Sequence, residues 1–414
     1  MLTNKLIERP IITIEDYLEH FKGFDSLNLE KEISFDFEWD FRRPSNKISP
    51  MIQLAKPEDA KKIVDLFLNT YLGMYPYREV QNIDEICNMI KDPSYHWFLF
   101  KIKPNIFVGC FGVHLEFKKK RAFYFGFIIK ENYRRFIDSV GAFAGSLCML
   151  YKIYKENILI WYSETRTAHN TSQYAENLCG LIPIAFFPNK DIFFNKIESD
   201  FMHIIFNKKV LKQNRSKNEP KIIRQVLNCY VYSNSLYHLG TPIIENPEIK
   251  FNSIKLKKIK ENLFKKIKIK KHSYRSIKLS LKDSNSYFKF LYNFGNKSVE
   301  KAIYKVRNSE ELFIFLQIVK EYINELKIRY FEIFVSAYHP SHQKIFLNAG
   351  FKPTGYIPCW NYNKRNDTFE DNIIFCHYPE NIKWNFETIP ETRMLIEALK
   401  FESFEQELIK SIIK

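Results

Sequence analysis

Glycine is scarce in this chain, with 12 among 414 residues. Because glycine is the residue that lets a backbone approach a phosphate closely, few positions suit a glycine-rich phosphate loop. The sequence has neither a P-loop nor a G-x-G-x-x-G segment, and it lacks the H-E-x-x-H and G-x-S-x-G motifs of zinc peptidases and serine hydrolases. The sequence therefore gives no support to these four kinds of site.

Cysteine pairs and long apolar runs are also missing. The seven cysteines are scattered without a C-x-x-C pair, which favours free thiols in a reducing compartment over disulfides or a zinc site. Asp200 and Asp371 stand apart from any ligand cluster, so we expect no metal. The apolar stretch 140–150 is too short to span a bilayer, and the first twenty residues lack the apolar core of a signal peptide. We expect a cytoplasmic protein without membrane insertion.

Positive charge is plentiful and concentrated in one segment. The formal net charge is +16, and residues 251–280 contain ten lysines and Arg275 against the single acid Glu261. Such a segment either binds an anionic partner such as nucleic acid or is a solvated connector. The sequence leaves both interpretations open.

Length and pattern predict more than one α/β unit. With 45% hydrophobic and 27% charged residues, the composition is that of a globular protein, and 414 residues suit two or three domains. From Met51 onward, strand-like runs alternate with amphipathic helical stretches, including three strand-like runs at 95–103, 105–117 and 121–130. We expect an N-terminal extension (1–50), a first domain (51–210), a basic helical connector (211–275), and a second, shortened domain with a C-terminal helix (276–414).

An internal repeat links the two halves at an offset of 170 residues. His169, Gln173, Gly180, Pro183 and Pro188 match His339, Gln343, Gly350, Pro353 and Pro358. The shared pattern, H-x3-Q-x6-G-x2-P-x4-P, follows a strand-like run in both copies and predicts a short helix ended by glycine before another strand. The histidine and glutamine lie on one face of that helix, where they either form a site or tie the helix to the strand.

These segments resemble the GCN5-related N-acetyltransferase (GNAT) family. MIQLAKPEDAKKIVDLF resembles the opening strand and helix of that family, and SQYAENLCGLIP and HQKIFLNAGFKP both resemble its late helix–glycine–strand segment. The resemblance covers 51–206 and, in part, 276–380. It implies an α/β (α+β) fold with two GNAT-like mixed sheets flanked by helices, similar to the layout of tandem members of the family.

The resemblance also implies acyl-CoA, typically acetyl-CoA, as the co-substrate. The family motif V-x-P-x-Y-R-x-x-G-x-G/A aligns with 129–139, but its two glycine positions hold Ile137 and Ser139. A Cβ hinders close approach to phosphate, although neighbouring arginines could pair with it directly. The cofactor-binding residues so implied are Phe127, Ile128, Ile129, Tyr133, Arg134, Arg135, Gly141 and Asn170.

Acyl transfer to an amine needs a base, an oxyanion stabiliser and an acid for the leaving thiolate. The tyrosine that the family often uses as acid is replaced by Glu176 and Phe346 in the two copies. We take Glu164, His169 and Tyr174 as catalytic candidates; the other residues considered are Glu116, Glu131 and Tyr133. Two functions follow: an acyl-CoA-dependent N-acyltransferase for a small amine or amino-acid-like acceptor, or a non-catalytic module that binds an anionic partner through 251–280.

Overall fold

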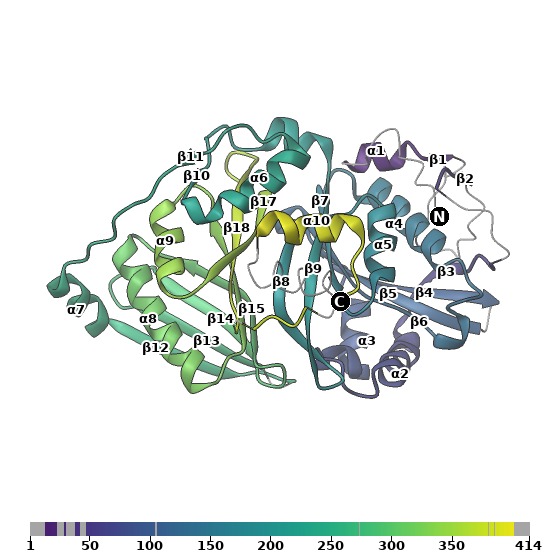
Figure 1. Ribbon diagram of the computed structural model, residues 1–414. Coiled ribbons are helices and arrows are strands. Elements are labelled where there is room, and N and C mark those ends of the chain that lie inside the picture. Colours follow the sequence, from purple (N-terminus) through teal and green to yellow (C-terminus); the bar gives the residue numbers. More distant parts are fainter. Residues whose placement is uncertain are drawn as a thin grey trace, which may run out of the picture.

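The computed structural model describes residues 13–22, 29, 38–41, 47–103, 106–272, 274–379, 381–384 and 386–400. Much of the expected N-terminal extension lies outside these residues, as does the expected helix beyond residue 400. Figure 1 shows a mixed α/β molecule in which helices pack against one long, twisted sheet.

Two blocks of seven strands make up this sheet. The first block contains β3 (Met51–Leu54), β4 (Tyr95–Lys103), β5 (Ile106–Glu116), β6 (Arg121–Ile129), β7 (Ile160–Arg166), β8 (Ile182–Phe193) and β9 (Lys196–Phe206). The second contains β12 (Leu263–Ile269), β13 (Tyr274–Leu281), β14 (Tyr287–Asn293), β15 (Ser298–Lys305), β16 (Tyr330–Ser336), β17 (Lys352–Asn363) and β18 (Thr368–His377). Short pairs form from β1 (Phe21–Lys22) with β2 (Glu38–Trp39), and from β10 (Lys221–Ile222) with β11 (Ile243–Ile244).

The two blocks have the same strand order and the same strand directions. From its outer edge inward, the first block runs β3-β4-β5-β6-β7-β9-β8 and the second runs β12-β13-β14-β15-β16-β18-β17. Neighbours are antiparallel except for one parallel pair in each block, β6 with β7 and β15 with β16. The three strand-like runs expected between 95 and 130 are confirmed as the antiparallel strands β4, β5 and β6.

The two blocks meet in one 14-stranded sheet, where the sequence predicted two sheets. They join through an antiparallel contact between Gly355 of β17 and Ala185 of β8. A Cβ added at Gly355 would lie 2.3 Å from the Cβ of Ala185, so only glycine permits this approach. The sequence did not predict this contact, because the residue pattern of a strand does not identify a partner strand in the other half of the chain.

The helices are α1 (Ile14–Leu18), α2 (Ala60–Tyr71), α3 (Ile83–Lys91), α4 (Ser139–Tyr154), α5 (Asn170–Leu178), α6 (Leu227–Tyr237), α7 (Ser253–Glu261), α8 (Ser309–Glu325), α9 (Pro340–Asn348) and α10 (Pro390–Leu399). In the first block, α2 and α3 pack on one face of the sheet, around Phe67, Trp97 and Leu99, and α4 packs on the other, around Phe111 and Phe143. Within the described residues, no helix combines the length and the apolar character needed to cross a bilayer.

The segment 211–275 contains more than the helical connector expected from the sequence. It includes α6 and α7, but its last part forms β12, which pairs with β13 over seven positions from Leu263–Leu281 to Ile269–Arg275. The lysines of this segment therefore lie partly on the outermost strand of the second block. Their alternation with Leu263, Ile267 and Ile269 is a strand pattern that the density of charge obscured.

Candidate functional site

The parallel strands β6 and β7 part halfway along their length. Their pairs run from Arg121–Ile160 to Tyr124–Ser163, although β6 continues to Ile129 and β7 to Arg166. Beyond the parting, β6 carries a bulge, because Gly126 and Phe127 together oppose one residue of β5, and Gly126 has a φ of 64°. Parted strands leave backbone groups without a ladder partner, so this is where an extended ligand could add hydrogen bonds.

The loop between β6 and α4 makes its hydrogen bonds within the protein. The amide N–H of Asp138 donates to the carbonyl of Ile48 at 2.9 Å, and that of Ile48 donates to Phe136 at 2.8 Å. The Asp138 side chain caps α4, since its Oδ1 accepts from the N–H of Gly141 at 2.9 Å. A carboxylate thus occupies the helix N-terminus, the position at which the family resemblance implied a pyrophosphate.

All of the expected cofactor-binding residues except Asn170 lie in or next to this loop. Arg134 and Arg135 are exposed, and Arg134 donates from Nε to the carbonyl of Ile129 at 3.1 Å. The Phe127 ring packs 5.1 Å from Phe143. The remaining members of the set lie as follows: Ile128 and Ile129 are buried, Tyr133 packs against the core under α4, Gly141 is in the first turn of α4, and Asn170 is exposed.

The three catalytic candidates do not form one cluster. Glu164 is on β7 and binds Lys190, whereas His169 and Tyr174 are exposed on or next to α5. No hydrogen bond joins these three side chains in the part of the chain that the structure describes. His169 is the residue before α5 and does not cap the helix with its side chain.

The repeated glutamines tie the late helix of each block to the strand before it. Gln173 and Gln343 are fully buried and donate from Nε2 to the last residue of the preceding strand, Arg166 at 3.2 Å and Ser336 at 3.1 Å. Each side-chain amide also makes hydrogen bonds to a segment that is distant in sequence. Gln173 bonds Glu387 and Thr392, and Gln343 bonds Lys221 and Ile223. The sequence left two roles open for this helix face, a binding site or a tie between helix and strand. These contacts are those of a tie between helix and strand.

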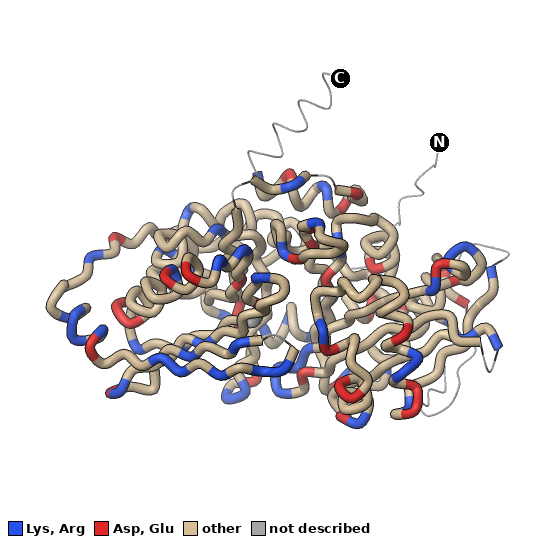
Figure 2. Tube along the Cα trace, turned by 90° about the horizontal axis from the view of Figure 1, so that it is seen from below, with Lys and Arg blue, Asp and Glu red and all other residues tan. Residues whose placement is uncertain are grey.

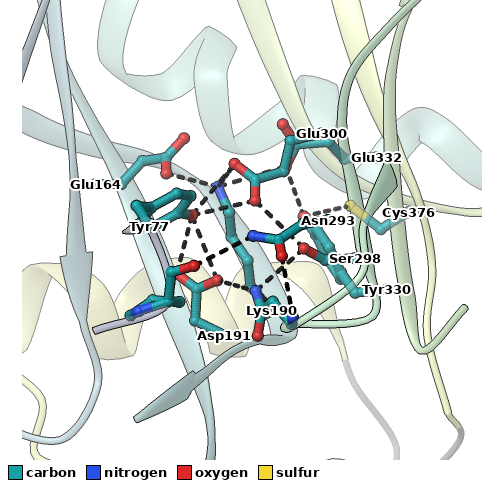
Figure 3. Close-up of polar contacts among 12 residues, drawn as sticks. Tyr77, Glu164, Lys190, Asp191, Asn293, Ser298, Glu300, Tyr330, Glu332 and Cys376 are labelled. Atoms are coloured by element: carbon teal, nitrogen blue, oxygen red, sulfur yellow. Dashed lines mark hydrogen bonds and ion pairs between the residues drawn. The ribbon is translucent and has the colours of Figure 1, made fainter. Parts of the chain in front are cut away.

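A buried lysine forms the densest polar cluster in the described structure. Lys190 of β8 has no exposed side-chain surface, and its Nζ lies 2.5 Å from Glu164, 3.5 Å from Glu332 and 3.8 Å from Glu300 (Figure 3). Glu164 comes from the first block, and both other glutamates come from the second. The cluster therefore connects the two blocks, and its Glu164 directly follows Ser163, the last β7 residue that pairs with β6.

Neighbouring polar groups complete the cluster, which we call the Lys190 cluster. The Tyr77 hydroxyl is a hydrogen-bond donor that lies 3.1 Å from the carboxylate of Asp191 and 3.1 Å from that of Glu300, so the two carboxylates share it. Asn296 donates to Asp191 at 2.6 Å. Tyr330 donates to Glu332 at 2.8 Å (Figure 3). The sequence offered one signal of this site, the polar triplet Asn-Lys-Asp at 189–191 inside the otherwise apolar run 182–193.

Burial and charge set the protonation of the cluster. Burial raises the pKa of Asp191 to about 7, with Glu300 adding repulsion, and burial likewise raises the pKa of Glu332 to about 7. Burial alone would lower the pKa of Lys190, but the surrounding carboxylates, Glu164 foremost, hold it well above its ordinary value. Lys190 is thus a permanent cation beside two acids, Asp191 and Glu332, that retain protons near neutral pH.

Glu176 is a further buried acid, outside the Lys190 cluster and on the opposite face of β7 from Glu164. It is on α5 and shares a short hydrogen bond with the hydroxyl of Ser163, the residue at which β7 parts from β6. Burial raises the pKa of Glu176 to about 8, so the carboxyl is mostly protonated at neutral pH. A neutral carboxylic acid at the parting is able to donate a proton.

Aromatic side chains surround Arg166 at the far end of β7. Arg166 pairs with Glu198 through two hydrogen bonds of 2.8 and 2.9 Å, and its guanidinium lies 3.8 Å above the ring of Phe193. Tyr71, at the end of α2, stacks against the same hairpin. This contact joins α2 to the β8–β9 hairpin across the face on which Glu164 lies.

Several solved acetyltransferase structures are similar to part of the chain. A spermidine N-acetyltransferase variant from Vibrio cholerae aligns with 38% of this chain and 94% of its own, at 14% identity and a TM-score of 0.34. A ribosomal-protein-S5-alanine acetyltransferase from Vibrio fischeri covers 42% and 97% of the two chains, at 12% identity and a TM-score of 0.34. The microcin C7 self-immunity acetyltransferase, solved with acetyl-CoA and AMP, covers 37% and 92%, at 13% identity and a TM-score of 0.31.

At these identities and TM-scores, the likeness assigns no activity to this chain. No protein-family model and no curated protein sequence matches it.

Proposed function

We propose that this chain is an acyl-CoA-dependent N-acyltransferase that acylates the amine of a small or amino-acid-like acceptor in the cytoplasm. The observation that carries the proposal is the parting of β6 from β7, with the bulge at Gly126 on one side and Glu176 at its base. An extended pantetheine arm can pair with the free edge of β6 as an added strand would. The matching strand orders of the two blocks support an origin by duplication.

The proposed chemistry divides the proton transfers between two carboxyl groups. The neutral amine attacks the thioester carbonyl carbon, the C–S bond breaks, and the acyl group ends on nitrogen. Glu164, whose side chain is 19% exposed, accepts the proton that the amine loses. Glu176 replaces the tyrosine implied by the resemblance and protonates the leaving thiolate, because its raised pKa keeps it protonated near pH 7. Glu164 then releases its proton to solvent, and Glu176 regains one from solvent.

Acyl-CoA binding needs a different phosphate contact from the one that the family resemblance implied. Because the Asp138 carboxylate caps α4 and the loop amides are already bonded, the helix terminus contributes little to an anion. Arg134 and Arg135 are exposed beside it, and they supply the charge that pairs with the pyrophosphate. The proposed contact is thus made by side chains and depends on ionic strength.

Titration calorimetry with acetyl-CoA and longer acyl-CoA thioesters tests this proposal. Binding should be measurable for the wild type and weaken at least about tenfold in Arg134→Ala/Arg135→Ala, since each charge-assisted contact contributes about 1.5–3 kcal/mol. Lys118→Ala/Lys119→Ala, which removes two exposed cations elsewhere in the first block, is the matched control. Failure to bind any acyl-CoA, or equal binding by both double variants, would contradict the proposal.

A further inference from the structure

The second block lacks the helix pair that covers one face of the first block. In the first block, α2 and α3 connect β3 to β4 and bury the face that carries Trp97 and Leu99. In the second block, only 270–273 connect the corresponding strands β12 and β13. Helix α8 packs on the other face, against Ile277, Leu279 and Phe288. The face that α2 and α3 would cover is therefore open to solvent over much of β12–β15, and we call it the open face. One end of it is covered by the first block, where Glu79 contacts Tyr274 and Pro76 accepts a hydrogen bond from Asn293.

Strand register places three lysines in a row across the open face. Lys266 of β12 pairs with Lys278 of β13, which pairs with Lys289 of β14, which in turn pairs with Ile303 of β15. Adjacent strands are about 4.8 Å apart, so the three ammonium groups are attached within roughly 10 Å. All three lysines are exposed, and Lys268 and Lys305 are exposed in the neighbouring rows. Figure 2, which shows the molecule from below, has many Lys and Arg positions in blue along the strands at its lower left.

This arrangement works against the stability of the sheet. Like charges directly opposite each other on paired strands are destabilising. Within the described residues, Lys266, Lys278 and Lys289 make no salt bridge, whereas Lys265, on the opposite face of β12, lies 3.9 Å from Glu321. A row of cations without salt-bridge partners on a sheet face is the complement of a regularly spaced polyanion.

Aromatic side chains lie in the row next to the lysines. Phe264 of β12 pairs with Ser280, which pairs with Tyr287 of β14, so both rings are on the open face. Phe264 is 43% exposed, and Lys278 lies 5.1 Å from the centre of the Tyr287 ring. The exposed Phe264 ring and the half-buried Tyr287 ring, beside these cations, provide stacking surfaces for bases whose phosphates the cations bind.

We propose that the open face binds single-stranded nucleic acid, with Lys266, Lys278 and Lys289 on consecutive phosphates and Phe264 and Tyr287 under unstacked bases. A single strand fits better than a duplex because the bases of a duplex are stacked on one another and cannot stack on rings that lie on a sheet face. The inference concerns the second block alone and does not depend on acyl transfer in the first.

Fluorescence anisotropy with the full chain tests the inference. The probes are labelled 20-nucleotide U-RNA and T-DNA single strands, a duplex DNA of the same length, and vesicles with phosphatidylserine. We expect both single strands to bind more tightly than the duplex, with RNA and DNA compared to identify the preferred sugar. Affinity should fall with salt at a slope of about −0.7 per phosphate contacted.

Two sets of variants separate charge from stacking. The first set tests charge: Lys266→Glu/Lys278→Glu/Lys289→Glu should weaken binding more than tenfold and reduce the salt slope by about 2. Its control is Lys91→Glu/Lys103→Glu/Lys118→Glu, which makes the same charge change at exposed sites of the first block. The control variant should retain most of the affinity. Phe264→Ala/Tyr287→Ala should weaken binding at least about fivefold with an unchanged salt slope. Thermal unfolding verifies that each variant is folded.

The inference is overturned by any of three results. These are equal binding by the two lysine triple variants, duplex binding as tight as single-strand binding, and association with the vesicles but with none of the nucleic acids.

Discussion

The ammonium group of Lys190 lies 2.5 Å from the carboxylate of Glu164, and the Lys190 side chain has no contact with solvent. Glu164 belongs to the first block, and Glu300 and Glu332, which face the same ammonium, belong to the second. One cation therefore neutralises carboxylates from both blocks. Its removal leaves several acids buried without a positive partner, and this gives the first prediction.

Lys190→Met should lower the free energy of unfolding by about 3–5 kcal/mol at pH 7.5, the usual effect of breaking a buried ion pair on one side. The loss should be smaller at pH 5.5, because protonation of Asp191 and Glu332, whose pKa values are about 7, removes the unbalanced charge. Urea unfolding at both pH values measures this, with the exposed Lys103→Met as the control. A loss below about 1 kcal/mol would show that the cluster does not hold the blocks together.

Gly355→Ala should destabilise the joint between the two blocks. The added Cβ would meet the Cβ of Ala185 at 2.3 Å, so β17 and β8 have to move apart. Overpacking of this kind costs about 1–3 kcal/mol. The control is Gly295→Ala, where the nearest atom to the added Cβ is a side-chain oxygen at 3.5 Å. Differential scanning calorimetry that shows equal shifts for both variants would contradict the prediction.

Glu176 should make stability decrease with pH. Its folded pKa of about 8 is above the ordinary value of 4.5, so between these values the folded state holds a proton that the unfolded state has lost. The contribution is complete below about pH 4.5 and disappears as pH rises through 8. Across this window the wild type should lose about 1 kcal/mol per pH unit relative to Glu176→Gln.

Urea unfolding of the wild type and Glu176→Gln at pH 5, 6, 7 and 8 measures this difference. Gln keeps the shape and an acceptor for Ser163 while removing the titration. If the two proteins have the same pH slope, Glu176 ionises normally and cannot supply the proton in the proposed mechanism.

Asp138→Ser should strengthen acyl-CoA binding. Serine still caps α4 toward Gly141 but removes the negative charge from the helix N-terminus. A charge at this position contributes about 0.3–1 kcal/mol, so affinity should rise about two- to fivefold at low salt and less at high salt. Calorimetry with acetyl-CoA measures the change. Unchanged affinity at low salt would place the pyrophosphate away from this helix.

Local pattern was enough to predict most elements of the fold. The strand-like runs at 95–103 and 121–130 became β4 and β6, and the helical spacing at 311–326 became α8, with Leu312, Leu316 and Val319 buried. Gly180 and Gly350 have the positive φ expected of residues that end a helix. Each of these features depends on side chains close together in sequence, so periodicity and turn residues reveal them.

The candidate site was predicted less well. Glu164 was named from its place on a strand, but its partner Lys190 was not, because the contacts that define the Lys190 cluster cross from β7 to β8, β15 and β16. The sequence shows the positive charge of 251–280. The row formed by Lys266, Lys278 and Lys289 depends on strand register, so the sequence did not reveal it.

The sequence by itself determined most of the strands and helices, where the H-x3-Q-x6-G-x2-P-x4-P pattern repeats, and how much positive charge the chain carries. Tertiary structure alone decided that the two blocks share one sheet through Gly355 and Ala185, that Lys190 is buried among acids from both blocks, and that one sheet face stays open. The physical reason is the separation along the sequence over which each interaction acts. Backbone preference and periodicity act over a few residues, whereas burial, ion pairing and sheet joining depend on residues that only folding brings together.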